Sequence, residues 1–243
     1  MRRLTAILLL LSLSACGYGS PKASGPTATP PSSPTAAAPT LPPCPHGGEG
    51  LCLGPLAAGT YTTQYFQPAI TYTVPRGWDS EEDQPGNFLL IPPGGDLPGV
   101  DEGTSDFLGI YSSVAAPDGC KDAPAPGVGM TAAAVSDWLT RDPSLVVTAK
   151  HPVTVGGLTG VVMDLAVSAR AKPCPYSNGK PIAPYLIGVG SSRLEHNTGP
   201  GQKTRMYVLN HAGAALAIEV VDVHGGRDLD VHAAITQQLS FSG

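Results

Sequence analysis

The alternation of apolar and polar positions predicts a chain built mainly from β-strands. β-Branched and aromatic residues that alternate with polar ones are typical of half-buried strands, and short apolar runs are typical of buried strands. Strands are predicted over 60–65, 70–74, 88–91, 107–114, 145–148, 153–155, 158–167, 185–189, 205–209 and 215–223. The segments from 145 onward follow one another closely, so we expect them to form an antiparallel meander.

Turn residues separate these strands. Pro75 and Gly77 in the run Val74-Pro75-Arg76-Gly77 favour a type I turn, after which Trp78 can pack on the sheet. Gly156-Gly157 has the length and composition of a two-residue hairpin turn. The stretch 92–105 is rich in proline, glycine and acidic residues, which predicts an exposed loop.

Helical spacing occurs in two places. The first predicted helix covers 132–141, where Val135, Trp138 and Leu139 recur at helical spacing, with Thr131 as its N-cap and Asp142-Pro143 at its end. The second covers 229–238 and is expected to bury the face made by Val231, Ala234, Ile235 and Leu239, with Phe241 packing beyond it. The predicted fold class is therefore α+β, mostly antiparallel sheet with two amphipathic helices.

The N-terminus has the layout of a secretory signal. Arg2 and Arg3 precede an apolar stretch, 4–13, that is shorter than the roughly 20 residues of a membrane span. The following Leu13-Ser14-Ala15-Cys16 resembles the bacterial lipobox, in which cysteine receives a diacylglyceryl group and becomes the new N-terminus. We expect a signal peptide over 1–15 and lipidation of Cys16; an ordinary signal peptide cut after Ser14 is the alternative.

Composition divides the rest of the chain. Residues 16–43 are dominated by proline, serine, threonine and alanine without apolar periodicity, which predicts a disordered tether. Residues 44–243 are long enough for one domain with its own core, expected to start near 59. The net charge is −5, and loss of Arg2 and Arg3 would make it −7. This acidity argues against nucleic acid and a polybasic membrane surface as partners.

Five cysteines fit a secreted chain in which one is lipidated. The other four, Cys44, Cys52, Cys120 and Cys174, allow three pairings. The short glycine-rich stretch after Cys44 favours a bridge to Cys52, which leaves Cys120 for Cys174. A zinc site that uses Cys44 and His46 is disfavoured, because the spacing matches no CxxC pair and an oxidising compartment disfavours free thiols.

Several of these segments together carry a resemblance. Gly59-Thr60-Tyr61, the run 70–78, Trp138-Leu139 with Asp142-Pro143, the hairpin 155–160 and the ending 238–241 are similar to uncharacterised envelope lipoproteins of high-GC Gram-positive bacteria. The strand leading to Val74-Pro75 and the late helix also resemble the PsbP-like α/β/α sandwich. The resemblance implies a fold rather than a reaction, since its motifs are strands, turns and caps. It includes the Cys120 and Cys174 pattern but not Cys44 and Cys52.

Candidate chemistry is sparse, and no common catalytic or nucleotide-binding motif is present. Asp222, His224, Asp228 and His232, together with Asp230, could hold a divalent metal at a strand-to-helix junction, although aspartates also favour a helix start without one. Arg193, His196, Lys203 and Arg205 form a local basic cluster that could bind an anion or only be solvated. Four tyrosines could line a groove or pack on the sheet: Tyr111, Tyr176, Tyr185 and Tyr207.

These observations favour a non-catalytic cell-envelope lipoprotein, anchored by Cys16 on the outer face of the membrane, that binds another envelope protein or a small ligand. No cofactor is expected. One alternative is a carrier of a small ligand or lipid with a pocket behind the sheet. Another is a hydrolase in which His224 or His196 activates a nucleophile such as Ser191.

Overall fold

A computed structural model describes residues 53–189 and 195–242. They belong to the second of two units, Leu41–Gly243. The expected signal peptide, Cys16, the tether and the Cys44–Cys52 pair lie outside the described residues, as do Ser191 and Arg193. Within the described residues, no helix is long and apolar enough to cross a membrane.

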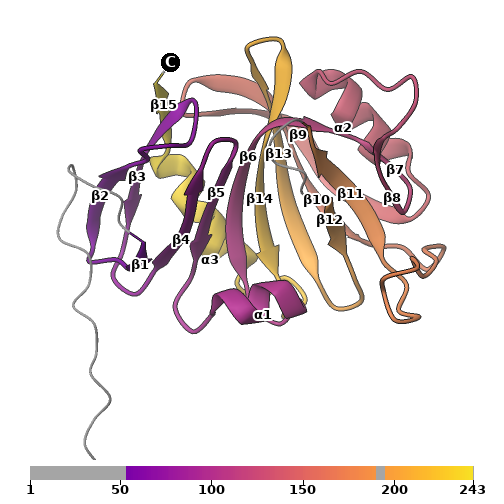
Figure 1. The fold of residues 1–243 in the computed structure, drawn as a ribbon, viewed down its shortest axis with the longest axis horizontal. Coiled ribbons are helices and arrows are strands. Elements are labelled where there is room, and N and C mark those ends of the chain that lie inside the picture. The colour runs from indigo at the N-terminus through magenta and orange to yellow at the C-terminus, as the bar shows by residue number, and fades with distance from the viewer. Residues whose placement is uncertain (1–52, 190–194, 243) are drawn as a thin grey trace, which may run out of the picture. The chain divides into compact units, whose positions relative to one another are not determined.

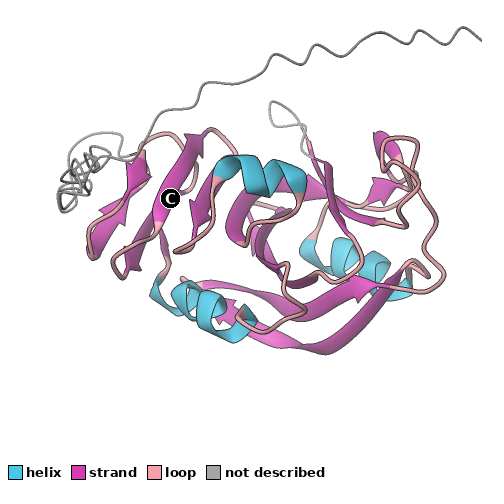
Figure 2. Ribbon diagram, turned by 90° about the horizontal axis from the view of Figure 1, so that it is seen from below, coloured by secondary structure: helices cyan, strands magenta, loops and turns pink. Residues whose placement is uncertain are grey.

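The described chain is mostly antiparallel β-sheet with few helices (Figures 1 and 2). The strands are β1 Gly54–Pro55, β2 Gly59–Thr62, β3 Ala69–Val74, β4 Asp79–Gln84, β5 Asn87–Ile91, β6 Phe107–Ala115, β7 Pro117–Asp118, β8 Lys121–Pro124, β9 Leu145–Val155, β10 Leu158–Val167, β11 Ala183–Gly188, β12 Glu195–Thr198, β13 Lys203–His211, β14 Ala214–Asp222 and β15 Ser240–Ser242. The helices are α1 Leu97–Glu102, α2 Ala132–Arg141, α3 Leu229–Ala233 and the 3-10 helix η1 Ala234–Gln238.

The main sheet has the order β1-β4-β5-β6-β14-β13-β10-β9. β11 and β12 branch from β6 in the same sheet, and a smaller sheet, β15-β3-β2, and the pair β7-β8 complete the described strands. The hairpin between β9 and β10 turns at Gly156-Gly157 as predicted, and both glycines have positive φ, a conformation that costs glycine little. The meander is correct for β9, β10, β13 and β14. However, β11 leaves it to pair with β6 and with β12.

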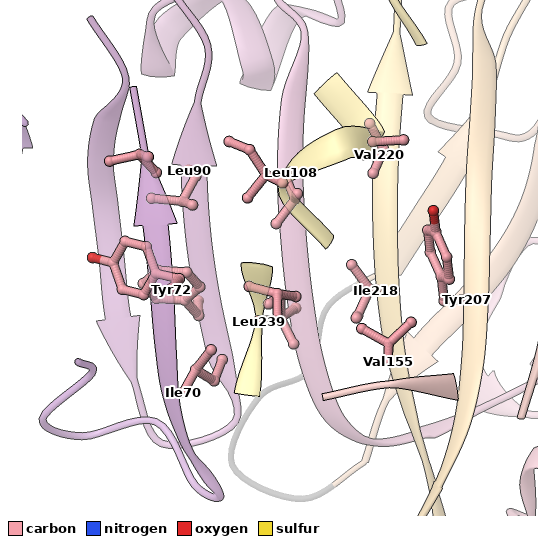
Figure 3. Packing of buried hydrophobic residues seen from close by; sticks show 14 of the residues in the cluster. Ile70, Tyr72, Leu90, Leu108, Val155, Tyr207, Ile218, Val220 and Leu239 are labelled. Atoms are coloured by element: carbon pink, nitrogen blue, oxygen red, sulfur yellow. The ribbon is translucent and has the colours of Figure 1, made fainter. Parts of the chain in front are cut away.

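Alternating side chains of β14 supply two separate apolar cores. Leu216, Ile218 and Val220 point into a core with β3, α3 and η1 (Figure 3). Ala215 and Ala217 point to the opposite face, into a core with α2 and β11. This division follows from the period of two along a strand, and it makes β14 the central strand of both cores.

The first predicted helix is confirmed in position and in its cap. α2 spans Ala132–Arg141, and the Thr131 side chain accepts a hydrogen bond of 3.2 Å from the N–H of Ala134. Val135 and Leu139 are fully buried, as their spacing predicted.

The buried face predicted for the second helix is partly wrong. The segment Leu229–Gln238 begins as α3 and tightens into η1 at Ala234, which rotates the side chains out of a simple 3.6-residue repeat. Ile235 and Leu239 are buried as expected, whereas Ala234 is exposed and Val231 is 68% exposed. Phe241 packs against the core as predicted, and β15 pairs with β3.

β4 and α1 are among the elements that arise where the sequence predicts none. β4 is entirely polar, but its backbone pairs with β5 and Asp83 accepts hydrogen bonds from the N–H groups of Gln64, Tyr65 and Phe66 at 2.6–3.2 Å. The predicted loop 92–105 contains α1. Its N-cap is Asp96, whose Oδ1 accepts a hydrogen bond of 2.7 Å from Gly99.

The predicted bridge between Cys120 and Cys174 is confirmed. Their Cα atoms are 5.5 Å apart, and the two cysteines are 54 positions apart in the chain. The bridge joins the turn between β7 and β8 to the connection between β10 and β11.

Candidate functional site

The candidate site begins with a fully buried carboxylate. Glu219 interrupts the apolar strand β14, which ends at Asp222, and the Glu219 side chain is 0% exposed. Two tyrosine hydroxyls donate to it, Tyr111 from β6 to Oε1 at 2.8 Å and Tyr185 from β11 to Oε2 at 2.7 Å. A buried carboxylate is expensive unless donors surround it, so β6 and β11 supply the partners that β14 alone lacks.

His196 supplies the third contact with this carboxylate. It lies on β12, and its Nδ1 is 2.7 Å from Oε1 of Glu219. The imidazole ring also packs on the ring of Tyr111, with centroids 4.3 Å apart. Because an ionised carboxylate only accepts hydrogen bonds, Nδ1 carries the proton, and Nε2 is an acceptor in the neutral imidazole.

A cavity of about 520 Å³ lies beside this cluster. Tyr111, Tyr185 and His196 line it, α1 and the start of β6 provide further wall, and the turn between β12 and β13 closes another side. In Figure 1, α1 lies below the ends of the central strands. The Gln202 side chain joins two of the walls, since its Nε2 donates to the carbonyl of Gly103 at 3.2 Å.

Two polar atoms of the cavity lining have no hydrogen-bond partner among the described residues. One is Nε2 of His196, and the other is Oδ1 of Asn87, a residue that is 7% exposed. The amide orientation of Asn87 is determined by its neighbour, since Nδ2 donates to the carboxylate of Glu82. Each unpaired buried polar atom costs about 1–3 kcal/mol, a cost that a bound partner would remove.

Negative charge predominates around the cavity. Glu82, Asp101 and Glu102 line it, and Lys180 is the lining residue of opposite charge. Burial raises the pKa of Glu82, and the charge of Asp101 raises it further, while the bond from Asn87 and the nearby His196 oppose the rise. The pKa of the Tyr111 hydroxyl is raised well above 10 by burial and by the charge of Glu219.

A second cavity, of about 1080 Å³, lies at α3 and η1. Apolar parts of Trp78, Pro75 and the exposed Val231 line one side, and His232 packs edge-on against Trp78 with ring centroids 5.8 Å apart. Asp106 lines the same cavity.

Some of the predicted metal ligands lie close together beside this second cavity. Oxygen and nitrogen atoms of Asp222, His224 and Asp106 lie within 4.8 Å of one another, and Nδ1 of His232 is 3.5 Å from Oδ2 of Asp106. The contact of Asp228 with this group is made by its backbone N–H, which donates a hydrogen bond to Asp222. Asp106, which the sequence interpretation missed, also accepts a hydrogen bond of 2.8 Å from the N–H of Val223.

Asp222 already has a structural task. Its two oxygens accept three backbone hydrogen bonds, from His224 at 2.7 Å, Gly226 at 2.9 Å and Asp228 at 2.6 Å. Burial raises the pKa of this carboxyl, but the three N–H donors and the nearby His224 outweigh burial and lower the pKa below its ordinary value. The carboxylate therefore organises the turn from β14 into α3.

The three described members of the predicted basic cluster, His196, Lys203 and Arg205, do not come together as an anion site. Arg205 makes two bonds to Asp164, at 2.7 and 3.0 Å, and one of 2.7 Å to Asp230. Its hydrogen bonds to Asp164 raise the pKa of the guanidinium. His196 faces Glu219, and Lys203 is exposed. Arg205 thus serves as a tie between β10, β13 and α3.

The four tyrosines separate into different roles. Tyr111 and Tyr185 line the first cavity, Tyr207 is buried in the core with α3, and Tyr176 is exposed. Sequence interpretation missed Glu219. A lone glutamate in the apolar run 214–222 is the signal that could have revealed it, because a strand buried on both faces accommodates a charge only beside partners.

A scan against models of known protein families found no match, and neither did a search of curated proteins. Among solved structures, the cyanobacterial PsbP (CyanoP) from Synechocystis sp. PCC 6803 is similar over 79% of this chain and 98% of that chain, with 11% identity and a TM-score of 0.36. A Bacteroides thetaiotaomicron VPI-5482 protein is similar over 72% of this chain, with 11% identity and a TM-score of 0.35. This chain covers 45% of the Bacteroides protein.

Proposed function

We propose that the protein is a non-catalytic binding module of the cell envelope, and that the cavity beside Glu219 and His196 is its site for a small ligand. The lipobox-like Leu13-Ser14-Ala15-Cys16 supports a lipid anchor on the outer face of the membrane. The resemblance to envelope lipoproteins of high-GC Gram-positive bacteria belongs to the same proposal.

The observation that carries the ligand site is the polar cluster itself. Glu219 interrupts the α2-side core with a charge and is tolerated there because three other strands each supply one donor. A binding site commonly combines a concave surface with a few convergent polar groups. Here the cluster lies beside a cavity and leaves Nε2 of His196 and Oδ1 of Asn87 unpaired.

A binding role explains this arrangement better than hydrolysis does. A hydrolase that used His196 or His224 would need a nucleophile within hydrogen-bond reach. Among the described residues, Nε2 of His196 has no hydroxyl or thiol as a hydrogen-bond partner, and Nδ1 of each histidine faces a carboxylate, Glu219 at 2.7 Å and Asp106 at 3.5 Å.

The second cavity supports a different candidate, a carrier of an apolar ligand. Its lining includes Trp78 and Val231, and Val231 is 68% exposed although large and apolar. An exposed apolar side chain beside a large cavity would be covered by a lipid chain or similar molecule.

Native mass spectrometry of the full lipoprotein in mild detergent tests these proposals together. We expect a small molecule to co-purify with the wild type and with Val231→Glu, and to be lost from His196→Ala. Loss from Val231→Glu alone would favour the apolar carrier. If no small molecule is retained by any of the three proteins, the ligand-site proposal fails.

A further inference from the structure

The polar atoms that the cavity beside Glu219 offers to a ligand include several hydrogen-bond acceptors. Oδ1 of Asn87 is an acceptor, because Nδ2 of the same amide is used by Glu82. Nε2 of His196 is the other unpaired atom, and it accepts a hydrogen bond when the ring is neutral, since the single proton then lies on Nδ1 beside Glu219. The carboxylate of Glu82 is an acceptor in its ionised form.

The charges around these acceptors are mostly negative. Glu82, Asp101 and Glu102 oppose Lys180 at the lining, and Glu219 adds a fourth carboxylate directly behind Tyr111 and His196. Glu82 is half-buried and Glu219 is fully buried, so these two charges are screened less than they would be at an open surface, whereas Asp101 and Glu102 are exposed.

Aromatic rings complete the lining. Tyr111, Tyr185 and Phe107 all border the cavity. The face of an aromatic ring attracts a cation by roughly 0.5–2 kcal/mol, and more when the cation is desolvated. Acceptors, negative charge and aromatic rings are each favourable for the same kind of ligand and unfavourable for an anion.

Resting on the proposed ligand site, we infer that the cavity binds a small organic cation that carries N–H donors, an ammonium or a guanidinium group. The N–H groups of the cation donate to Asn87, His196 and Glu82, and its charge offsets the surplus of carboxylates. The two unpaired polar atoms gain partners in the complex.

Matched four-carbon probes test the charge of the ligand. Butane-1,4-diamine, butane-1,4-diol and succinate share one chain length and differ in their end groups, and agmatine adds a guanidinium. Isothermal titration of the full lipoprotein in detergent at low ionic strength should show saturable binding of the diamine and agmatine, at least about tenfold stronger than that of the diol, and none of succinate.

Glu82→Gln and Glu81→Gln form the matched pair of variants. They are neighbours on β4 and change the net charge equally, but only Glu82 lines the cavity. Glu82→Gln keeps an oxygen for the Asn87 bond, so its fold should persist, and circular dichroism checks this. We expect Glu82→Gln to weaken binding of the diamine about tenfold and Glu81→Gln to change it less than about twofold.

The outcomes separate this inference from the ligand site on which it rests. Binding of the diol or succinate as tight as that of the diamine, lost in His196→Ala, would keep the site and overturn the cationic ligand. Equal effects of the two glutamate variants would also overturn it. If neither cation binds up to about 10 mM, the inference fails; if nothing co-purifies with the lipoprotein either, the ligand site fails with it.

Discussion

Nδ1 of His196 lies 2.7 Å from Oε1 of Glu219, and the histidine joins a strand at the edge of the sheet to the strand at its centre. Tyr111 donates to the same oxygen and packs on the same imidazole ring. The three side chains therefore form one unit, and a change in any of them alters the surroundings of the other two.

Removal of the carboxylate should destabilise the whole domain. In Glu219→Leu, two tyrosine hydroxyls and a ring nitrogen lose a buried acceptor, and we expect a loss of about 3 kcal/mol in the free energy of unfolding. Urea unfolding followed by tryptophan fluorescence measures this. The exposed Glu102→Gln is the control and should stay within about 0.5 kcal/mol. A loss below about 1 kcal/mol in Glu219→Leu would contradict the expectation.

Tyr111 and Tyr185 should ionise late in an alkaline titration. Burial and the charge of Glu219 raise the pKa of both hydroxyls well above 10. Since the folded pKa exceeds the unfolded one, the stabilising contribution is complete below about pH 10 and declines as the pH rises above it. Tyrosinate absorbance should show these two phenols ionising together with loss of near-ultraviolet circular dichroism, and the double Tyr→Phe variant should lack this late fraction. Ionisation near pH 10 in a protein that remains folded would disagree with their burial.

The turn after β14 should depend on the charge of Asp222. Asp222→Asn leaves one acceptor oxygen for three backbone N–H groups, so we expect a loss of about 2 kcal/mol near neutral pH. The folded pKa of Asp222 is lowered. The stabilising contribution is therefore present above the unfolded pKa and disappears as the pH falls through the folded pKa, so wild type and variant should converge in acid. Thermal unfolding across this pH range measures the difference. Asp228→Asn, whose side chain makes no capping bond, should change stability little, and an equal loss in both variants would refute the role of Asp222.

The proposed lipid anchor can be tested in cells. Cys16→Ala removes the sulfur that would carry the diacylglyceryl group, so we expect it to abolish palmitate incorporation and to release the protein from the membrane fraction. Ser14→Thr keeps the cysteine and serves as the control. Unchanged palmitate labelling in Cys16→Ala would show that Cys16 is not the attachment point.

Sequence periodicity was sufficient to predict the elements in which apolar and polar side chains recur at the spacing of a strand or a helix. The apolar alternation of β10 and the spacing of Val135 and Leu139 in α2 identified both elements. Gly156-Gly157 located the hairpin between β9 and β10. β4 was missed because its side chains are polar while its backbone, paired with β5, determines its conformation. α1 was missed because Pro98 and Gly99 suggest a loop, although proline is well tolerated in a first helical turn.

The candidate site could be predicted only in fragments. Tyr111, Tyr185 and His196 were singled out for separate reasons, as possible groove lining and as a basic cluster. Their convergence on Glu219 depends on β11 leaving the meander to pair with β6, which brings Tyr185 to the carboxylate. Strand order in a sheet is a long-range property, and local patterns contain little information about it.

The separation of these partners along the chain affects how the cavity forms. Tyr111 and Glu219 are 108 positions apart, and the Gln202 tie to Gly103 spans 99. Contacts of such high sequence separation form slowly, because a long loop must close before the contact stabilises it. The cavity is complete only after β14 has inserted beside β6. A chain that ends before Ala214 would retain most of the lining residues but would lack the strand that carries Glu219, so ligand capture would serve as an assay for the insertion of β14.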